Sequence, residues 1–244
     1  MSTGKFYIRL ITGVLIMALI GAILEGCGNT AERETRIKKA LEQKYNEKFE
    51  VLRFHRQGIM EQYYTAEVYA ESYPELPFLV TMDTEDDFFS DGYVMKRGTN
   101  LISSHASENV GKLKGMYYIH TQSMFPDSVS ENPDIELKEY LESEKNNFFT
   151  IYLYLDPSAE DPDSLYAAVS EILKGMEPME GSIEIFFADE KRMDRIREYV
   201  ESHASLEDEY VKLGEECHVT GIRFCKGKLN INEDEFLDRV RTNL

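Results

Sequence analysis

Phe148–Leu155, with the sequence FFTIYLYL, is the most strand-like run of the chain. Its aromatic and β-branched residues favour extended structure and indicate a buried strand. A helix is predicted before it, at 135–145. Another is predicted after it, beginning at Asp161-Pro162, because Asp is a good N-cap and Pro suits the first helical position. The chain around this strand is therefore predicted to mix helices and strands.

The elements that follow continue this pattern. The helix begun at Pro162 is predicted to end at Gly175, and 182–187 (SIEIFF) to form a second buried strand. Asp189 is predicted to cap the next helix. Asn232, with Glu235 three residues later, resembles a capping box for the terminal helix.

Two cysteines lie in a hairpin predicted at 217–231, and its turn decides whether they can bond. A turn at 226–228 (KGK) leaves Cys217 and Cys225 at opposite ends of one strand, about 26 Å apart at about 3.3 Å per residue. A disulfide needs Cα atoms within about 7 Å, which a turn at 220–221 would allow. We expect free thiols, and the disulfide stays open as the alternative.

The region before this part is predicted to contain a helix at 31–46 and strands at 48–56, 60–71 and 78–82. Short connections favour a meander. The strand at 60–71 alternates between a buried face and a wet face. The buried face is expected to hold Tyr64, Ala66, Val68 and Ala70, and the wet face Tyr63, Thr65, Glu67, Tyr69 and Glu71.

A helix, a strand and a break complete this region. Ser90 is predicted to cap a helix from 91 to about 113, and 116–124 (MYYIHTQSM) to form a fourth strand. Prolines and polar residues at 126–134 mark the best internal boundary. The fold class is therefore predicted as α+β, with antiparallel-rich sheets and packed helices that could form two small α+β halves.

The N-terminus has the layout of a secretory signal peptide. Two basic residues precede an apolar run at 10–24, and small or polar residues follow it. The run ends in LEGC at 24–27, which resembles the lipobox of bacterial lipoproteins, with Glu25 as the position that departs from the pattern. The resemblance implies cleavage before Cys27 and a diacylglycerol linked to its sulfur. The helix that leads into 44–51 (KYNEKFEV) looks like the opening of many uncharacterised lipoproteins of Gram-positive bacteria.

An uncleaved N-terminal helix is the alternative anchor. The run at 6–24 approaches the about 20 residues needed to span the hydrocarbon core, and Arg9 can extend to the headgroups. Both alternatives place the protein at the cell membrane on its extracytoplasmic face. The predicted organisation is a signal peptide at 1–26, a tether at 27–30, a first half with a strand meander at 31–125, a linker at 126–134 and a second half at 135–244.

The part beyond the signal peptide is strongly acidic. The whole chain has a net charge of −18, and residues 1–26 carry Lys5, Arg9 and Glu25, a net of +1, which leaves −19 for the rest. Such a charge repels nucleic acid phosphates. We therefore expect no nucleic acid partner, whereas a protein or small-molecule ligand stays unidentified.

The sequence offers no catalytic signature such as a Gly-x-Ser-x-Gly elbow, a His-Glu-x-x-His motif or a Gly-rich phosphate loop. Its histidines are scattered without metal-ligand spacing, at His55, His105, His120, His203 and His218. One acidic cluster could hold a hard cation, but its spacing differs from an EF-hand and a solvated loop is expected. It consists of Asp83, Glu85, Asp86, Asp87 and Asp91. We expect no catalytic residue, metal or cofactor.

Tyrosines on or beside the predicted strands are candidates for a binding surface, because Tyr combines a large apolar body with a polar tip. They are Tyr63, Tyr69, Tyr73, Tyr117 and Tyr118, with ordinary cross-strand packing as the alternative. The sequence favours a membrane-tethered, non-catalytic binding or interaction module. A solute-binding lipoprotein of a transporter, with two βα-rich lobes, and a cell-envelope hydrolase are the alternatives.

Overall fold

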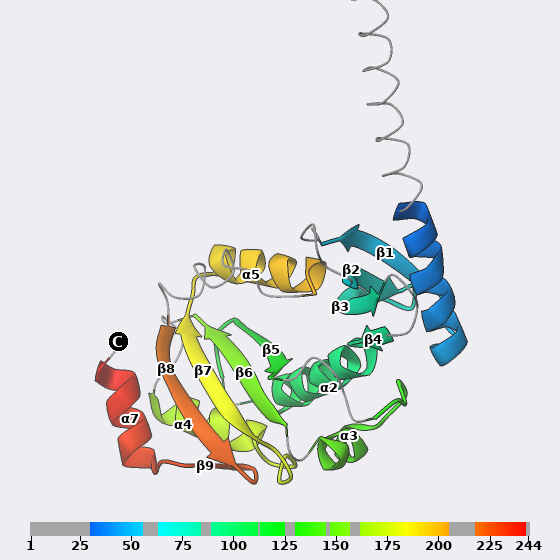
Figure 1. The fold of residues 1–244 in the computed structure, drawn as a ribbon. Coiled ribbons are helices and arrows are strands. Elements are labelled where there is room, and N and C mark those ends of the chain that lie inside the picture. Colours follow the sequence, from blue (N-terminus) through cyan, green and yellow to red (C-terminus); the bar gives the residue numbers. More distant parts are fainter. Residues whose placement is uncertain are drawn as a thin grey trace, which may run out of the picture.

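The computed structural model describes residues 30–55, 63–83, 89–111, 113–124, 130–144, 147–156, 162–204 and 218–242 of the chain. The predicted signal peptide, Cys27 and most of the acidic cluster lie outside these ranges. Figure 1 shows a helix at 30–45 beside a small sheet, and a larger sheet with helices on both of its faces. Within the described ranges, no helix combines the length and apolarity that crossing a membrane requires.

The first sheet is an antiparallel meander, as predicted. Its strands follow each other in the order β1 (Phe49–Phe54), β2 (Tyr63–Ala70), β3 (Tyr73–Asp83) and β4 (Phe89–Asp91).

One face of this sheet packs against the helix at 30–45 and the start of α2 (Tyr93–Asn109). The predicted buried face of β2 is confirmed for Tyr64, Ala66, Val68 and Ala70. The opposite face differs from the prediction at Glu67, which is fully buried instead of wet. Arg53 in β1 and His55 just after it contact the Glu67 carboxylate. The alternation of residues along β2 alone could not predict these contacts, so it assigned Glu67 to the wrong environment.

β3 is longer than the predicted 78–82 and continues through Pro74 and Pro77. β4 pairs with β3 at 80–82, and the pairing of β2 with β3 is irregular near Ala70. A free edge and an irregular ladder tolerate residues without an N–H donor. The prolines therefore do not end the strand.

The start of α2 also differs from the prediction. Ser90 lies in β4, and the helix begins at Tyr93 after Gly92. The carboxylate of Asp91 accepts a hydrogen bond of 3.2 Å from the backbone N–H of Tyr93. The predicted Ser cap is wrong, and an Asp two residues before Tyr93 partly replaces it.

The second sheet contains one parallel pair among antiparallel ones. Its order is β5 (Tyr117–Ser123), β6 (Phe148–Leu155), β7 (Glu180–Phe187), β8 (His218–Cys225) and β9 (Lys228–Leu229). β6 and β7 are parallel and are joined through α4 (Pro162–Ile172).

The boundary between the sheets lies earlier than the expected linker at 126–134. β5 was grouped with the first half, but it pairs along its whole length with β6. The expected linker therefore connects two neighbouring strands of one sheet.

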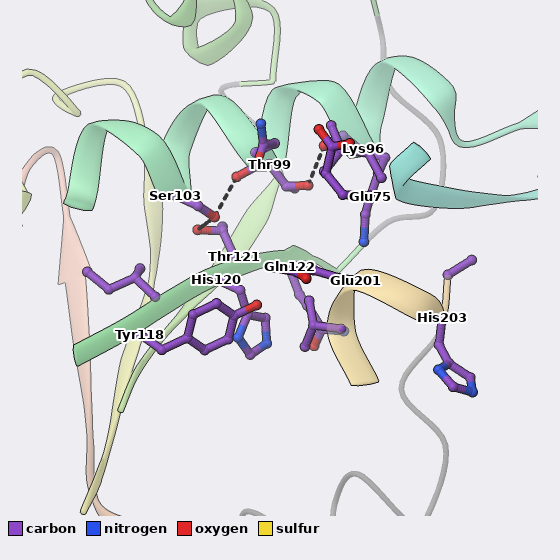
Figure 2. Close-up of a pocket in the computed structure, with 15 residues that line it drawn as sticks. Glu75, Lys96, Thr99, Ser103, Tyr118, His120, Thr121, Gln122, Glu201 and His203 are labelled. Carbon is purple, nitrogen blue, oxygen red and sulfur yellow. Dashed lines mark hydrogen bonds between the residues drawn. The ribbon is translucent and has the colours of Figure 1, made fainter. Parts of the chain in front are cut away.

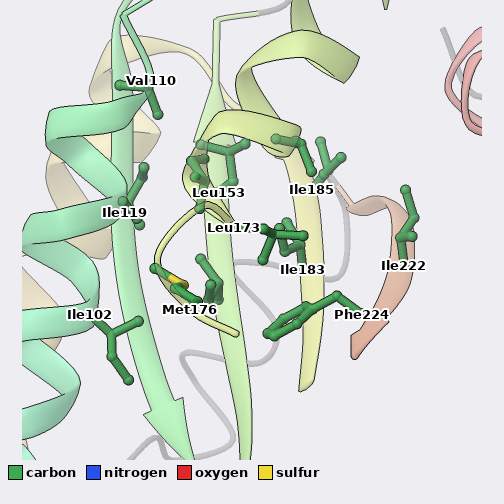
Figure 3. Packing of buried hydrophobic residues seen from close by; sticks show 14 of the residues in the cluster. Ile102, Val110, Ile119, Leu153, Leu173, Met176, Ile183, Ile185, Ile222 and Phe224 are labelled. Carbon is green, nitrogen blue, oxygen red and sulfur yellow. The ribbon is translucent and has the colours of Figure 1, made fainter. Parts of the chain in front are cut away.

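Helices cover both faces of the second sheet. One face packs against α2, α3 (Leu137–Ser143), α4 and α7 (Glu233–Thr242) in the larger core (Figure 3). The other face carries Tyr154 and Phe186 against α5 (Glu190–Ser202). Helix α2 therefore belongs to both cores, because its first residues pack against the first sheet and later ones against the second.

Two of the three predicted helix caps of the second part are confirmed, and the third, at Asp161, lies outside the described residues. The Asp189 carboxylate accepts the N–H of Arg192 at 2.8 Å, and the Asn232 side-chain oxygen accepts the N–H of Glu235 at 2.9 Å. Each cap satisfies a backbone donor that the first helical turn leaves free.

The predicted turn after β8 is also confirmed, at 226–227. Cys225 ends a continuous strand and is a free thiol, 3.1 Å from a carboxylate oxygen of Glu180. Cys217 lies outside the described residues.

Candidate functional site

A pocket of about 150 Å³ lies between the two sheets, at the outer edge of β5. Figure 2 shows α2 on one side of it and the C-terminal end of α5 on another. The beginning of β3, at Glu75 and Leu76, forms a further wall. The pocket therefore depends on elements from both sheets.

The edge of β5 that lines the pocket is unpaired among the residues the structure describes. The N–H of Met124 donates to the carbonyl of Phe148 at 2.8 Å, so the even-numbered residues, such as His120, direct their backbone groups to β6. The N–H and C=O groups of Ile119 and Thr121 then face the open edge. They bring backbone donors and acceptors to the pocket.

Lys96 supplies a cation to this site. It occupies the same face of α2 as Asn100 and Ser103, one and two turns later, and all three line the pocket. Its side-chain nitrogen points from α2 towards β5 and α5 (Figure 2). Within the described part of the chain, no ion pair within 4.0 Å involves Lys96.

The surroundings of Lys96 disfavour its charge. Burial lowers the pKa of Lys96 to about 8, and the negative charge of Glu67 opposes that shift. The amine is thus protonated at neutral pH but binds its proton less tightly than a lysine in water. Such a cation gains more from an anionic partner than a fully hydrated one does.

Glu67 holds the opposing charge on the first sheet. One of its carboxylate oxygens lies 2.8 Å from Arg53 and 3.1 Å from His55. The other oxygen is buried and has no hydrogen-bond partner among the described residues. The charge of the Glu67 carboxylate therefore acts on Lys96 without a direct ion pair.

His120 is buried beneath the pocket and stays neutral. Its ring stacks on Tyr152 at 4.6 Å between centroids, with the planes 1° apart. Burial lowers the pKa of His120 to about 3, and the charge of Lys96 lowers it further in the same direction. At neutral pH this histidine cannot act as a cation.

Three aliphatic hydroxyl groups, of Thr99, Ser103 and Thr121, border the cavity. The Ser103 hydroxyl lies 2.9 Å from the carbonyl of Thr99 and 3.1 Å from the hydroxyl of Thr121 (Figure 2). The Thr99 hydroxyl donates to the carbonyl of Lys96 at 3.1 Å. The contact between Ser103 and Thr121 joins α2 to β5, and the other two lie within α2. None of them places a base beside a serine nucleophile.

Tyr118 and two glutamates define the pocket entrance. Burial raises the pKa of Tyr118, the charge of Glu201 raises it further, and Arg197 opposes both. The guanidinium of Arg197 lies 5.2 Å from the centre of the Tyr118 ring. Glu75 and Glu201 are exposed at the rim. The rim thus carries two carboxylates, with the Arg197 guanidinium beside Tyr118, and Lys96 provides a cation inside the pocket.

The tyrosines predicted as candidates for a binding surface lie in different parts of the structure. Of the five tyrosines, Tyr118 lines the pocket, while Tyr73 stacks under Arg97 and Tyr117 donates to the carbonyl of Ser107. Tyr63 is exposed and Tyr69 half-buried, both away from the pocket.

The histidines and the members of the acidic cluster also lie in different parts of the structure. His120 and His203 share the pocket, whereas His105 bonds the carbonyl of Lys174. Asp91 accepts hydrogen bonds from Tyr45 and Lys44, so this member of the cluster serves the fold. Among the described residues, no group of His, Cys, Asp or Glu is arranged to hold a metal ion.

Comparison with known proteins gives a likeness of fold. The sequence matches no family model and no curated protein. Its structure is similar to the crystal structure, at 2.55 Å resolution, of a DUF5037 family protein from Ruminococcus gnavus ATCC 29149. The TM-score is 0.65 at 16% identity, and the match covers 85% of this chain and 98% of that chain. At this identity the likeness extends to the fold alone.

Proposed function

We propose that this chain is a membrane-tethered, extracytoplasmic lipoprotein whose folded part is a non-catalytic module that binds a small ligand. The observation that carries the binding role is the pocket at the edge of β5, with Lys96 inside it and no ion-pair partner for that lysine among the described residues. Concave sites with a few convergent polar groups are the usual form of small-molecule sites.

The tether rests on the N-terminal sequence. The apolar run at 10–24 and the following LEGC at 24–27 favour lipid attachment at Cys27. The net charge of −19 beyond residue 26 favours a domain held off anionic headgroups, with no nucleic acid partner.

The pocket chemistry favours binding over catalysis. A general acid or base works best with a pKa near the operating pH, and burial keeps His120 far below it. Lys96 has a pKa of about 8, but in the described part of the chain its amine makes no hydrogen bond to Ser103 that could activate the hydroxyl. Ser103 is engaged with Thr99 and Thr121 instead of a base. The arrangement therefore gives a hydrolase no support.

The transporter alternative receives less support from the fold. A solute-binding lipoprotein of the expected kind has two βα-rich lobes. Here the first sheet is an antiparallel meander, and the parallel pair of β6 and β7 belongs to the second sheet.

Binding is tested by a thermal-shift screen of small molecules on the full chain in detergent. Asn100 is exposed and lines the pocket, so Asn100→Tyr should fill the pocket and abolish the shift caused by each true ligand. Ser104→Tyr is the matched control, because Ser104 is exposed on the same helix and does not line the pocket. Ligands that stabilise Asn100→Tyr as well as the wild type would place binding elsewhere and contradict the proposal.

The tether is tested separately by mass spectrometry of the N-terminus of the protein from membranes. A diacylglyceryl-Cys27 terminus is the expected result. A chain that starts at Met1 with an unmodified Cys27 would exclude lipidation.

A further inference from the structure

The charges around the pocket also limit what it can bind. We infer that the pocket takes a small organic monocarboxylate of about five to eight non-hydrogen atoms, held by the Lys96 ammonium and the open edge of β5. This inference rests on the proposed function, because it names the ligand class of the same site.

The first argument is the state of Lys96. Placing an ammonium group in a half-buried position is unfavourable unless an opposite charge accompanies it. The nearest source of compensation identified is Glu67, which acts at a distance and forms no ion pair with Lys96. A carboxylate in the pocket would provide the direct partner that the described residues do not.

The second argument is the backbone of β5. The outward N–H groups of Ile119 and Thr121 belong to an edge strand that pairs with no further strand among the described residues. A carboxylate has two oxygens and can accept from an ammonium and an amide together. The pocket is lined by both Lys96 and these two residues.

The third argument concerns the number of charges. Among the described residues that line the pocket, Lys96 is the only Lys or Arg, and His120 is kept neutral by burial. The rim carries Glu75 and Glu201, which repel additional negative charge. One interior cation behind an acidic entrance suits a monoanion and disfavours phosphate dianions.

The fourth argument is size. A cavity of about 150 Å³ is comparable to one known to hold benzene, which has six non-hydrogen atoms. A short aliphatic acid fits this limit, with its chain against Leu76, Ile119 and Val200. Longer ligands would extend past the glutamates into solvent.

The inference can be tested with butyrate, butyramide and butylamine, which differ in charge. Butyrate and butyramide each have six non-hydrogen atoms, and butylamine has five. Each is titrated into the ¹⁵N-labelled full chain in detergent, and backbone amide shifts of the pocket residues give the dissociation constants. Butyrate should bind with a dissociation constant about tenfold or more below those of butyramide and butylamine, since one charge-assisted contact contributes that factor.

Variants at Lys96 show whether its charge is responsible. Lys96→Met should weaken butyrate at least about tenfold and leave butyramide nearly unchanged, because the side-chain length is kept and the charge is lost. Lys96→Arg should retain preference for butyrate over butyramide. Lys174→Met, at an exposed lysine paired with Glu171, is the matched control and should bind like the wild type.

The outcomes separate this inference from the proposed function. Equal binding of butyramide or butylamine, or tighter binding of inorganic phosphate than of butyrate, would overturn the monocarboxylate while leaving a binding pocket. If Asn100→Tyr blocks screen hits but butyrate does not bind, the monocarboxylate is likewise overturned while the binding pocket stands. If Asn100→Tyr blocks no hit and butyrate does not bind, both conclusions fall.

Discussion

Replacing Lys96 with Met should stabilise the protein at neutral pH, although the substitution removes a charge from the proposed site. Met keeps a similar length and an unbranched apolar stem, so it can occupy the same path from α2 towards β5. The change removes an ammonium whose charge the surroundings disfavour. The expected gain in stability is the free energy that this charge costs the folded state.

The magnitude follows from the pKa of Lys96, which is lowered from 10.5 to about 8. At 1.36 kcal/mol per pH unit, this difference corresponds to about 3 kcal/mol. Because the side chain is half-buried and solvent screens part of the effect, we expect about 1–3 kcal/mol.

The pH dependence has a defined sign. Below pH 8 both the folded and the unfolded chain carry the charge, and the folded state bears the full cost. Between pH 8 and 10.5 the unfolded chain holds the proton more tightly than the folded state, so the stability of the wild type rises with pH. The advantage of Lys96→Met should therefore be largest near pH 6.5 and should disappear above about pH 10.5.

Urea unfolding followed by far-ultraviolet circular dichroism measures this difference at pH 6.5 and again above pH 10. Lys174→Met serves as the control for loss of one positive charge from the surface. A Lys96→Met protein that is less stable than the wild type at pH 6.5 would refute the reasoning. An advantage that does not change with pH would do so as well.

Three further predictions concern other parts of the chain. Gly98→Ala should lower the free energy of unfolding by about 1–3 kcal/mol despite the better helix propensity of Ala, because the new Cβ would overlap the ring of Tyr140. As the control, Gly111→Ala should be close to neutral in the same urea assay, because nothing lies within 4 Å of its new Cβ. His120→Gln should reduce the loss of stability on acidification, because the pKa of His120 is lowered from 6.5 to about 3 and the unfolded chain gains a proton first as pH falls through this window; unchanged acid sensitivity between pH 6.5 and 4 would contradict this. Cys27→Ser should abolish incorporation of labelled fatty acid, while the apolar run could still retain the chain in the membrane.

Local sequence signals predicted the elements of the second sheet well. Phe148–Leu155 is a strand over its full predicted length, because its aromatic, β-branched and aliphatic residues favour extended structure without reference to the neighbouring strands. Asp189 and Asn232 cap helices as expected, since an N-cap contacts a backbone N–H two or three residues away. Such short-range interactions are visible in the sequence.

Sheet membership was harder to predict because it depends on long-range pairing. β5 was correctly predicted as a strand, but its partner lies about 30 residues further along the chain, beyond the proline-containing segment at 126–134. The same polar segment that suggested a domain boundary connects the paired strands. Composition identifies a loop and does not identify which strands it joins.

The periodicity of helices and strands in the sequence could not indicate the site. Lys96, Asn100 and Ser103 form the polar face of a helix, which normally faces solvent. Glu67 occupies a polar position of an alternating strand and was placed on the wet side for the same reason. Arg53 and His55 contact the Glu67 carboxylate, and Lys96 lines the pocket where α2 faces β5, so both placements depend on the tertiary structure.

The likeness to the DUF5037 family protein concerns this tertiary arrangement. A match over 85% of the chain includes residues of both sheets, so this chain shares its fold with a protein at 16% identity. The framework supplies an open strand edge facing a helix, and the side chains of α2 decide what that space can hold. In this chain α2 places the Lys96 ammonium in the pocket, and β3 and α5 contribute Glu75 and Glu201 at its rim. The ligand selectivity proposed for this protein therefore depends on Lys96 and its surroundings, and comparison of folds alone cannot transfer it to other chains.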